Sequence, residues 1–142
     1  MNTIKKVTAL EDRKIDIRIK LSALWVALML LYIYCDILSL FRPGQLSEMM
    51  AGRMGPFPVT QGSLLISSIL MMIPAGMVVL SLTLRPQVAR WANILLGLLY
   101  VVVNISNLIG ETWIYYLSFA VLEIAVTLLI VWNAWKWTNP EG

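Results

Sequence analysis

The sequence predicts an all-α membrane protein, a single domain over residues 1–142 with four transmembrane helices in an up-down-up-down antiparallel bundle. Hydrophobic residues make up 59% of the chain and charged residues 13%, whereas soluble domains average about 25% charged residues. The apolar residues gather in four stretches, at 21–41, 63–84, 91–109 and 113–137. Each stretch is close to the length of about 20 residues that a helix needs to cross the hydrocarbon core.

The first stretch is expected to belong to a longer helix. Thr8 and Glu11 have the spacing of a capping box, which predicts a helix that begins near Ala9. The basic residues before position 21 and the length of the stretch argue against a cleavable signal peptide, so we expect 21–41 to be retained as the first span. Pro43 and the glycine after it end this helix.

The longest connection is predicted at residues 42–62. Within it, residues 47–51 fit a short interfacial helix, and the prolines on both sides of Phe57 force an extended path. Long loops are often functional, so we expect this one to pack over the mouth of the bundle. In the second span, Pro74 and Gly76 predict a kink.

The positions of the basic residues predict the orientation. Short connections at 85–90 and 110–112 make successive helices antiparallel. If both termini are cytoplasmic, the outside segments hold only Arg42 and Arg53 of the 11 basic residues. The inside segments then hold Lys5, Lys6, Arg13, Lys14, Arg18, Lys20, Arg85, Arg90 and Lys136. This bias obeys the positive-inside rule and favours one orientation.

The composition argues against several classes of chemistry. The single cysteine, Cys35, excludes an intrachain disulfide and a CxxC redox pair, and the chain has no histidine. The methionines are irregularly spaced, so apolar packing explains them better than a Cu(I) site. We therefore expect no catalytic residue set, no metal and no cofactor. We also expect no nucleic-acid partner, because the net charge of +3 reflects membrane topology.

Glu123 is the most informative residue of the apolar stretches. It is the only charged residue between Trp113 and Lys136. A carboxylate at membrane depth costs several kcal/mol unless it is paired, hydrated or protonated. Some other part of the protein must therefore solvate Glu123, and the partner should indicate function.

Polar residues form three stripes at helical spacing, all in the predicted outer half of the membrane. The stripes are Tyr32, Asp36 and Ser39; Tyr100, Asn104, Asn107 and Glu111; and Tyr116, Ala120, Glu123 and Thr127. Each stripe occupies one helix face. Because polar faces in lipid turn toward the bundle interior or a cavity, the stripes predict one shared polar site.

Two interpretations of this site stay open. Asn104 and Asn107 fit a structural role, in which their amides join helices through hydrogen bonds. Two carboxylates are harder to explain structurally, and a close pair would hold a proton or a cation. Glu123 favours this functional interpretation, whereas the two interpretations are balanced for Asp36.

The rim of the site is predicted to carry charged residues as well. Glu111 lies just before the last span, where a carboxylate is favoured by the helix dipole. Arg53 is hypothesised to fold over the mouth and to pair with Asp36 or Glu111.

Four segments of the chain resemble a known family: residues 10–16, 32–40, 49–58 and 104–111. Together they resemble an uncharacterised family of small four-helix integral membrane proteins of bacteria. The resemblance covers almost the whole chain and implies a multi-pass protein of the bacterial inner membrane. It implies nothing about chemistry.

Three functions are compatible with the sequence. The first is the binding or translocation of a small molecule, proton or cation at the polar site. The second is a non-catalytic subunit of a larger membrane complex or homo-oligomer. The third and weakest is an enzyme that acts on a lipid or quinone, since no histidine, metal cluster or nucleotide motif is present to support catalysis.

Overall fold

The computed structural model describes residues 13–138. In this part of the chain, four helices are long and apolar enough to cross a membrane. They are α1 (Ile17–Ser39), α3 (Gln61–Thr83), α4 (Pro86–Ser106) and α5 (Ile114–Lys136). The prediction of a helical membrane protein with four spans is confirmed, and the helices begin and end within a few residues of the predicted bounds.

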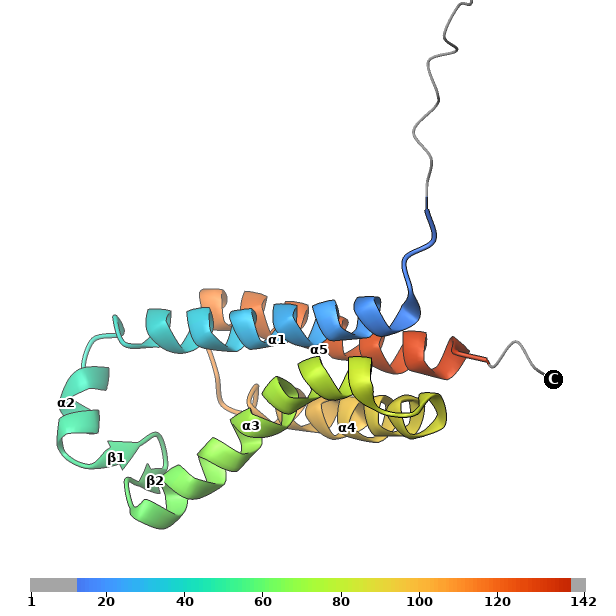
Figure 1. Cartoon of the computed structure of the whole chain (residues 1–142). Helices are drawn as coiled ribbons and strands as arrows, with labels where there is room; N and C mark the ends of the chain where they lie inside the picture. The colour runs from blue at the N-terminus through green and yellow to red at the C-terminus, as the bar shows by residue number, and fades with distance from the viewer. Residues whose placement is uncertain (1–12, 139–142) are drawn as a thin grey trace, which may run out of the picture.

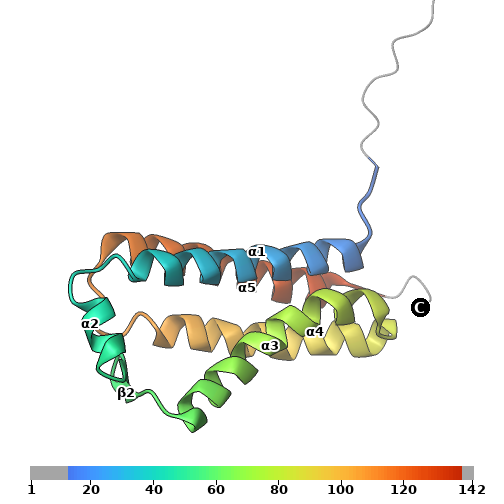
Figure 2. The same ribbon diagram turned by 60° about the vertical axis from the view of Figure 1, so that its left-hand side comes forward.

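The four helices lie side by side, with their connections at two opposite ends (Figure 1). One end, here called the loop end, carries the segment between α1 and α3 and the connection from α4 to α5. The other, here called the termini end, carries the α3–α4 connection and the described ends of the chain. Both views show α3 diverging from α1 toward the loop end (Figure 2). Which end faces the cytoplasm stays a prediction from the distribution of Lys and Arg.

Helix α1 begins later than predicted. Residues 13–16 are not helical, and the carboxylate of Asp16 accepts a hydrogen bond of 2.7 Å from the backbone N–H of Arg18. Asp16 is therefore the N-cap, a position that favours a short polar side chain. The prediction of one helix running on from Ala9 is wrong, while the Thr8–Glu11 capping box lies outside the described residues.

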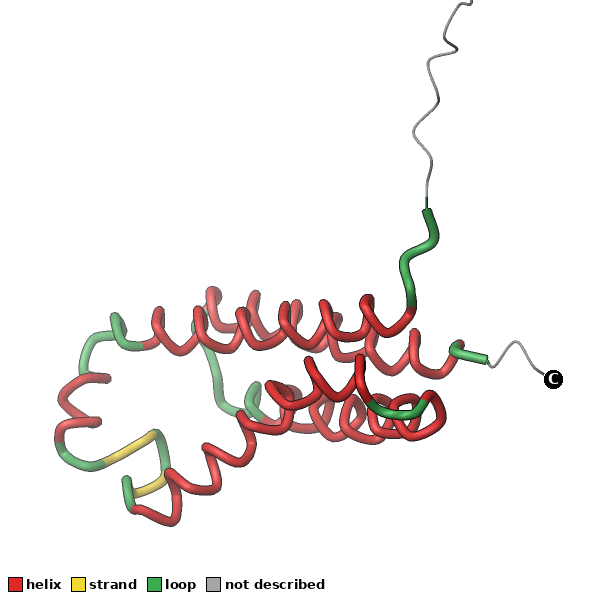
Figure 3. Tube along the Cα trace, in the orientation of Figure 1, coloured by secondary structure: helices red, strands yellow, loops and turns green. Residues whose placement is uncertain are grey.

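The segment between α1 and α3 folds into a short helix and a small hairpin (Figure 3). These are α2 (Gln45–Met50), β1 (Arg53–Met54) and β2 (Phe57–Pro58), with the strands antiparallel. The short helix and the extended path around Phe57 are confirmed. The prediction that this loop packs over the bundle mouth is wrong, because α2 buries no residue and lies beyond the helix ends.

A polar cluster joins three helices inside the apolar core. The indole N–H of Trp25 donates to Asn93 Oδ1 at 2.7 Å, and the hydroxyl of Ser81 donates to the same oxygen at 3.2 Å. The Asn93 amide donates to the carbonyl of Ala89 at 2.8 Å. Trp25 also packs edge to face on Tyr100, with ring centroids 5.8 Å apart. Trp25, Asn93 and Ser81 thus fix α1, α3 and α4 at one depth.

Helices α4 and α5 are in close contact at Gly97. A Cβ atom at this position would lie 2.7 Å from Cγ2 of Val131 and 3.5 Å from Cγ2 of Ile130. Both neighbours are β-branched and have little rotamer freedom in a helix. Only glycine therefore fits at this crossing.

Replacing Gly97 with leucine is expected to destabilise the bundle by about 1–3 kcal/mol, because the side chain must push α5 away. The matched control is Gly76→Leu, since a Cβ at Gly76 meets only Leu80 Cδ1, at 4.0 Å. Unfolding in detergent followed by circular dichroism measures both. Equal stability of the two variants would contradict the close approach of α4 and α5.

Candidate functional site

A polar pocket of about 70 Å³ lies in the half of the bundle nearer the loop end, and all four long helices line it. Its walls are Tyr32, Cys35 and Asp36 from α1, Leu70 and Met71 from α3, Tyr100, Val103 and Asn107 from α4, and Tyr116 and Glu123 from α5. The structure thus brings all the predicted site residues together except Asn104 and Arg53. Each of the three stripes contributes two residues to this one pocket.

The pocket has a buried floor and an open mouth. Glu123 is only 6% exposed, Tyr32 is 8% exposed and Tyr100 is fully buried. Asp36 and Asn107 are exposed and form the mouth. The two carboxylates therefore line one cavity from opposite helices, with one at its mouth and the other at its floor.

Tyr100 is held in place by the proline of α3. Pro74 has no N–H, so the carbonyl of Leu70 one turn earlier loses its helical partner. The Tyr100 hydroxyl donates a hydrogen bond to this carbonyl. A freed carbonyl in lipid must be satisfied by a neighbouring helix, and Tyr100 does this while it lines the pocket. Helix α3 continues through Pro74 without a break.

Tyr32 and Asn104 join α1 to α4 beside the pocket. The Tyr32 hydroxyl donates to Asn104 Oδ1 at 2.6 Å. Asn104 is fully buried and does not line the pocket, so it supports the wall through Tyr32. Its amide nitrogen has no hydrogen-bond partner among residues 13–138. The amide oxygen of Asn104 therefore has the predicted structural role, since it joins α4 to α1, whereas the amide nitrogen does not.

The Glu123 carboxylate has no such partner. Within residues 13–138, no hydrogen bond or ion pair from a protein side chain or backbone reaches its oxygens. Thr127, one turn further along α5, bonds the backbone carbonyls of Glu123 and Ile124, at 2.8 and 2.9 Å, instead of the carboxylate. The cavity is therefore the place where Glu123 must be solvated.

At the loop end, Arg42, Glu111 and Tyr115 are joined by an ion pair and a hydrogen bond and are here called the clasp. Arg42 Nη2 lies 2.9 Å from Glu111 Oε2, and Arg42 Nε donates to the Tyr115 hydroxyl. That hydroxyl also shares a hydrogen bond of 2.9 Å with Ser39 Oγ. The clasp connects the end of α1 to the start of α5, since Tyr115 lies in its first turn.

The clasp sets the charge state of Glu111. Burial alone would raise the pKa of its carboxyl, but the N–H of Trp113, the Arg42 guanidinium and the N–H of Thr112 outweigh burial and lower that pKa. The two N–H groups donate to Glu111 Oε1 at 3.0 and 2.9 Å, so the carboxylate lies just before α5, although α5 has no side-chain cap. The partner of Glu111 is Arg42 rather than Arg53, which lies exposed on β1.

The donor set of the pocket consists of oxygen groups, which suit a proton or a hard cation. Among residues 13–138, no group of three or more Asp, Glu, Cys or His side chains could hold a metal ion. The pocket instead offers two carboxylates, the Asn107 amide and the Tyr116 hydroxyl. Oxygen groups of this kind are hard ligands that prefer hard cations.

Comparison with known proteins identifies the family. The model of a family of unknown function, DUF6326, matches residues 8–141. The chain belongs to this family. No curated protein and no solved structure matches it. The family carries no assigned activity, so the pocket is the source of functional evidence for this member.

Several structurally important residues were not predicted from the sequence. Asn93 lies two turns before Tyr100 on the same helix face, so the stripe of α4 contained the signal. Trp25 gave no signal, because an apolar run does not reveal which indole is buried. Arg42 and Tyr115 are brought into contact by the path of the chain at the loop end, which the spacing of residues does not specify.

The link between Pro74 and Tyr100 can be tested by a double-mutant cycle. Tyr100→Phe should cost about 1–2 kcal/mol, because it leaves the Leu70 carbonyl unpaired in the membrane. In the Pro74→Ala background, the new N–H of residue 74 can bond this carbonyl, so the same change should cost much less. Detergent unfolding curves of the four proteins measure the difference. An equal cost in both backgrounds would contradict the link.

The clasp predicts a pH-dependent contribution to stability. Because the folded-state pKa of Glu111 lies below its ordinary value of 4.5, its contribution is complete above that value and disappears as pH falls through the folded-state pKa. Glu111→Gln should lose about 1 kcal/mol at neutral pH, with a smaller loss in strong acid. Thermal unfolding between pH 3 and 7 tests this, with the exposed Glu48→Gln as control. A constant difference across this range would exclude the carboxylate as the cause.

Proposed function

We propose that this protein binds a proton or a small monovalent cation in the pocket and passes it between the pocket and the outer surface. The observation that carries the proposal is the carboxylate of Glu123. It is almost fully buried at membrane depth, has no protein partner among the described residues, and borders a cavity shared with Asp36. A carboxylate in this setting is expensive, and a bound proton or cation would offset the cost.

The size of the cavity narrows the ligand. Pockets for drug-sized molecules measure about 300–1,000 Å³, whereas this one measures about 70 Å³. A volume of this size accommodates a few water molecules or one small ion with part of its hydration shell. The proposal therefore favours a proton or small cation over a larger organic substrate.

The distribution of polar contacts also supports a binding role over a purely structural one. The helices are already joined by Trp25 with Asn93, by Tyr32 with Asn104, and by Tyr100. None of these contacts uses a carboxylate. Asp36 and Glu123 are thus additional to the groups that stabilise the bundle, and the exposed position of Asp36 supports access from the loop end.

The proposal is tested by cation-dependent stability in detergent. The probes are NaCl and KCl against N-methylglucamine chloride at equal ionic strength, because the bulky organic cation is too large for the pocket. A cation at ten times its Kd adds about 1.4 kcal/mol, which corresponds to a rise in Tm of about 3–6 °C. Glu123→Gln should abolish the rise, and Asp36→Asn should reduce it.

Protons are tested separately by dye-reported proton uptake into proteoliposomes under an imposed potential. Wild-type protein should conduct, Glu123→Gln should not, and Glu48→Gln in α2 should behave as wild type. Wild-type protein that shows neither cation-dependent stability nor proton uptake would refute the proposal.

A further inference from the structure

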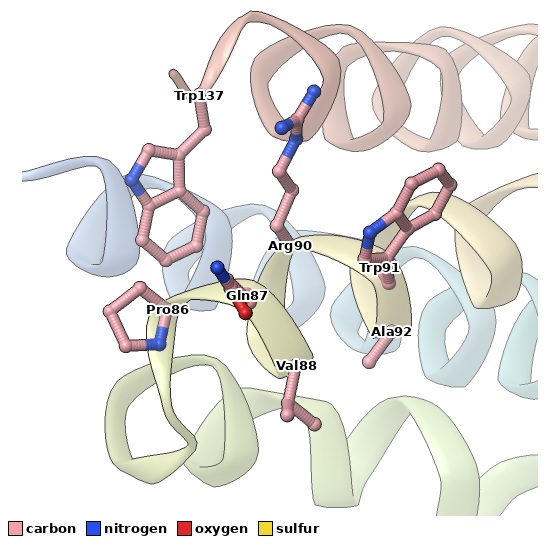
Figure 4. A pocket seen from close by; sticks show the side chains of 7 residues that line it. All are labelled: Pro86, Gln87, Val88, Arg90, Trp91, Ala92 and Trp137. Carbon is pink, nitrogen blue, oxygen red and sulfur yellow. The ribbon is translucent and has the colours of Figure 1, made fainter. Parts of the chain in front are cut away.

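A second cavity opens at the termini end, between the start of α4 and the end of α5. Its volume is about 700 Å³, and Pro86, Gln87, Arg90, Trp91 and Trp137 are among the residues that line it. Figure 4 shows the guanidinium of Arg90 between the indoles of Trp137 and Trp91, with Gln87 below it in this view. This cavity shares no lining residue with the pocket that contains Glu123 and lies at the opposite end of the bundle.

Arg90 supplies an incompletely paired positive charge. Its Nη2 donates to the carbonyl of Trp135 at 3.2 Å, near the end of α5. Its Nε has no hydrogen-bond partner among residues 13–138. The guanidinium carbon lies 6.0 Å from the centre of the Trp91 ring, a distance that allows a cation–π contact. The group is held in position at the cavity while part of its donor capacity stays unused.

The start of α4 adds further donors at the same place. Arg85 is the N-cap, and its side chain makes no capping hydrogen bond. Pro86 follows at the first helical position, so the next free N–H groups belong to Gln87 and Val88, which both line the cavity. An uncapped helix start attracts anions through these N–H groups and the helix dipole.

The surroundings of the cavity are strongly basic and lie at the membrane surface. The described charged residues of this end are Arg13, Lys14, Asp16, Arg18, Lys20, Arg85, Arg90 and Lys136. The guanidinium of Arg18 lies 5.8 Å from the ring centre of Trp137, which extends the positive field to the cavity wall. Tryptophans at the ends of spanning helices mark the headgroup level, where phosphate groups are the abundant anions.

We propose that this cavity binds a phosphate-bearing anion at the membrane surface, either the headgroup of an anionic phospholipid or free phosphate. Arg90 and the N–H groups at the start of α4 would hold the phosphate oxygens, and the indoles of Trp91 and Trp137 would flank the headgroup. This proposal is independent of the function proposed for the pocket around Glu123.

The test measures the thermal stability of the full chain in dodecyl maltoside against three probes at equal ionic strength: dihexanoyl-phosphatidylglycerol, dihexanoyl-phosphatidylcholine and sodium phosphate. Phosphatidylglycerol should raise Tm at concentrations where phosphatidylcholine does not. If phosphate acts at the same concentrations as phosphatidylglycerol, the site is one for free phosphate. If only phosphatidylglycerol acts, the site recognises the lipid.

Variants with equal charge changes locate the site. Arg90→Gln should raise the half-saturating concentration of phosphatidylglycerol about tenfold, the effect expected for one charge-assisted hydrogen bond. Lys20→Gln removes the same charge at the same end from an exposed residue that does not line the cavity, so its response should match wild type. Trp91→Leu, at a side chain that is 53% exposed, gives a second variant that should fold and should bind several-fold more weakly.

Two results would overturn the proposal. One is an equal effect of phosphatidylcholine and phosphatidylglycerol on wild-type protein, because it would show that the negative charge is not recognised. The other is an equal loss in Lys20→Gln and Arg90→Gln, because it would assign the effect to the general positive charge of this end.

Discussion

Inside a bilayer, each polar group must find its partner within the protein, and this constraint organises the bundle. Water is missing from the hydrocarbon layer, so an unpaired carbonyl, amide or hydroxyl is costly there. The carbonyl of Leu70, freed by Pro74, is bonded by Tyr100 from α4. Asn93 accepts from both Trp25 and Ser81. The polar contacts thus set the depth at which the helices meet, and apolar packing fills the space between.

Against this background, the two carboxylates that line the pocket are exceptions. The hydroxyls of Tyr32 and Tyr100 donate to protein acceptors, while the carboxylate of Glu123 accepts no hydrogen bond from residues 13–138. The groups that stabilise the fold are thus paired within the protein, and the Glu123 carboxylate is not paired within the described residues. At the loop end, by contrast, Glu111 is paired with Arg42 and with backbone N–H groups. One chain therefore contains a carboxylate with a structural explanation and another that lacks one.

Much of this architecture could be predicted from the sequence. Hydrophobic runs of spanning length fix the number of helices, and helical spacing places Tyr32, Tyr100 and Glu123 around one cavity. Neither argument predicts details that depend on competition between possible N-cap residues or on the path of the chain. Asp16 caps α1 instead of Thr8, a choice between two good N-caps that local rules do not decide.

Contacts between segments that are far apart in the sequence could not be predicted either. Arg42 rather than Arg53 meets Glu111, because Arg42 directly follows the end of α1 whereas Arg53 is carried away on the hairpin. The bond from Trp25 to Asn93 depends on the rotation of two helices about their axes, which a single sequence does not specify.

The proline of α3 has a mechanical consequence for the pocket. Helix α3 packs mainly on α1, touches α4 little, and diverges from its neighbours toward the loop end, whereas α4 and α5 are locked together at Gly97. Leu70 and Met71, which form one wall of the pocket, lie just on the diverging side of Pro74. The width of the pocket therefore depends on the direction of the α3 segment before Pro74, and Tyr100 ties this segment to α4 through its hydrogen bond to the Leu70 carbonyl.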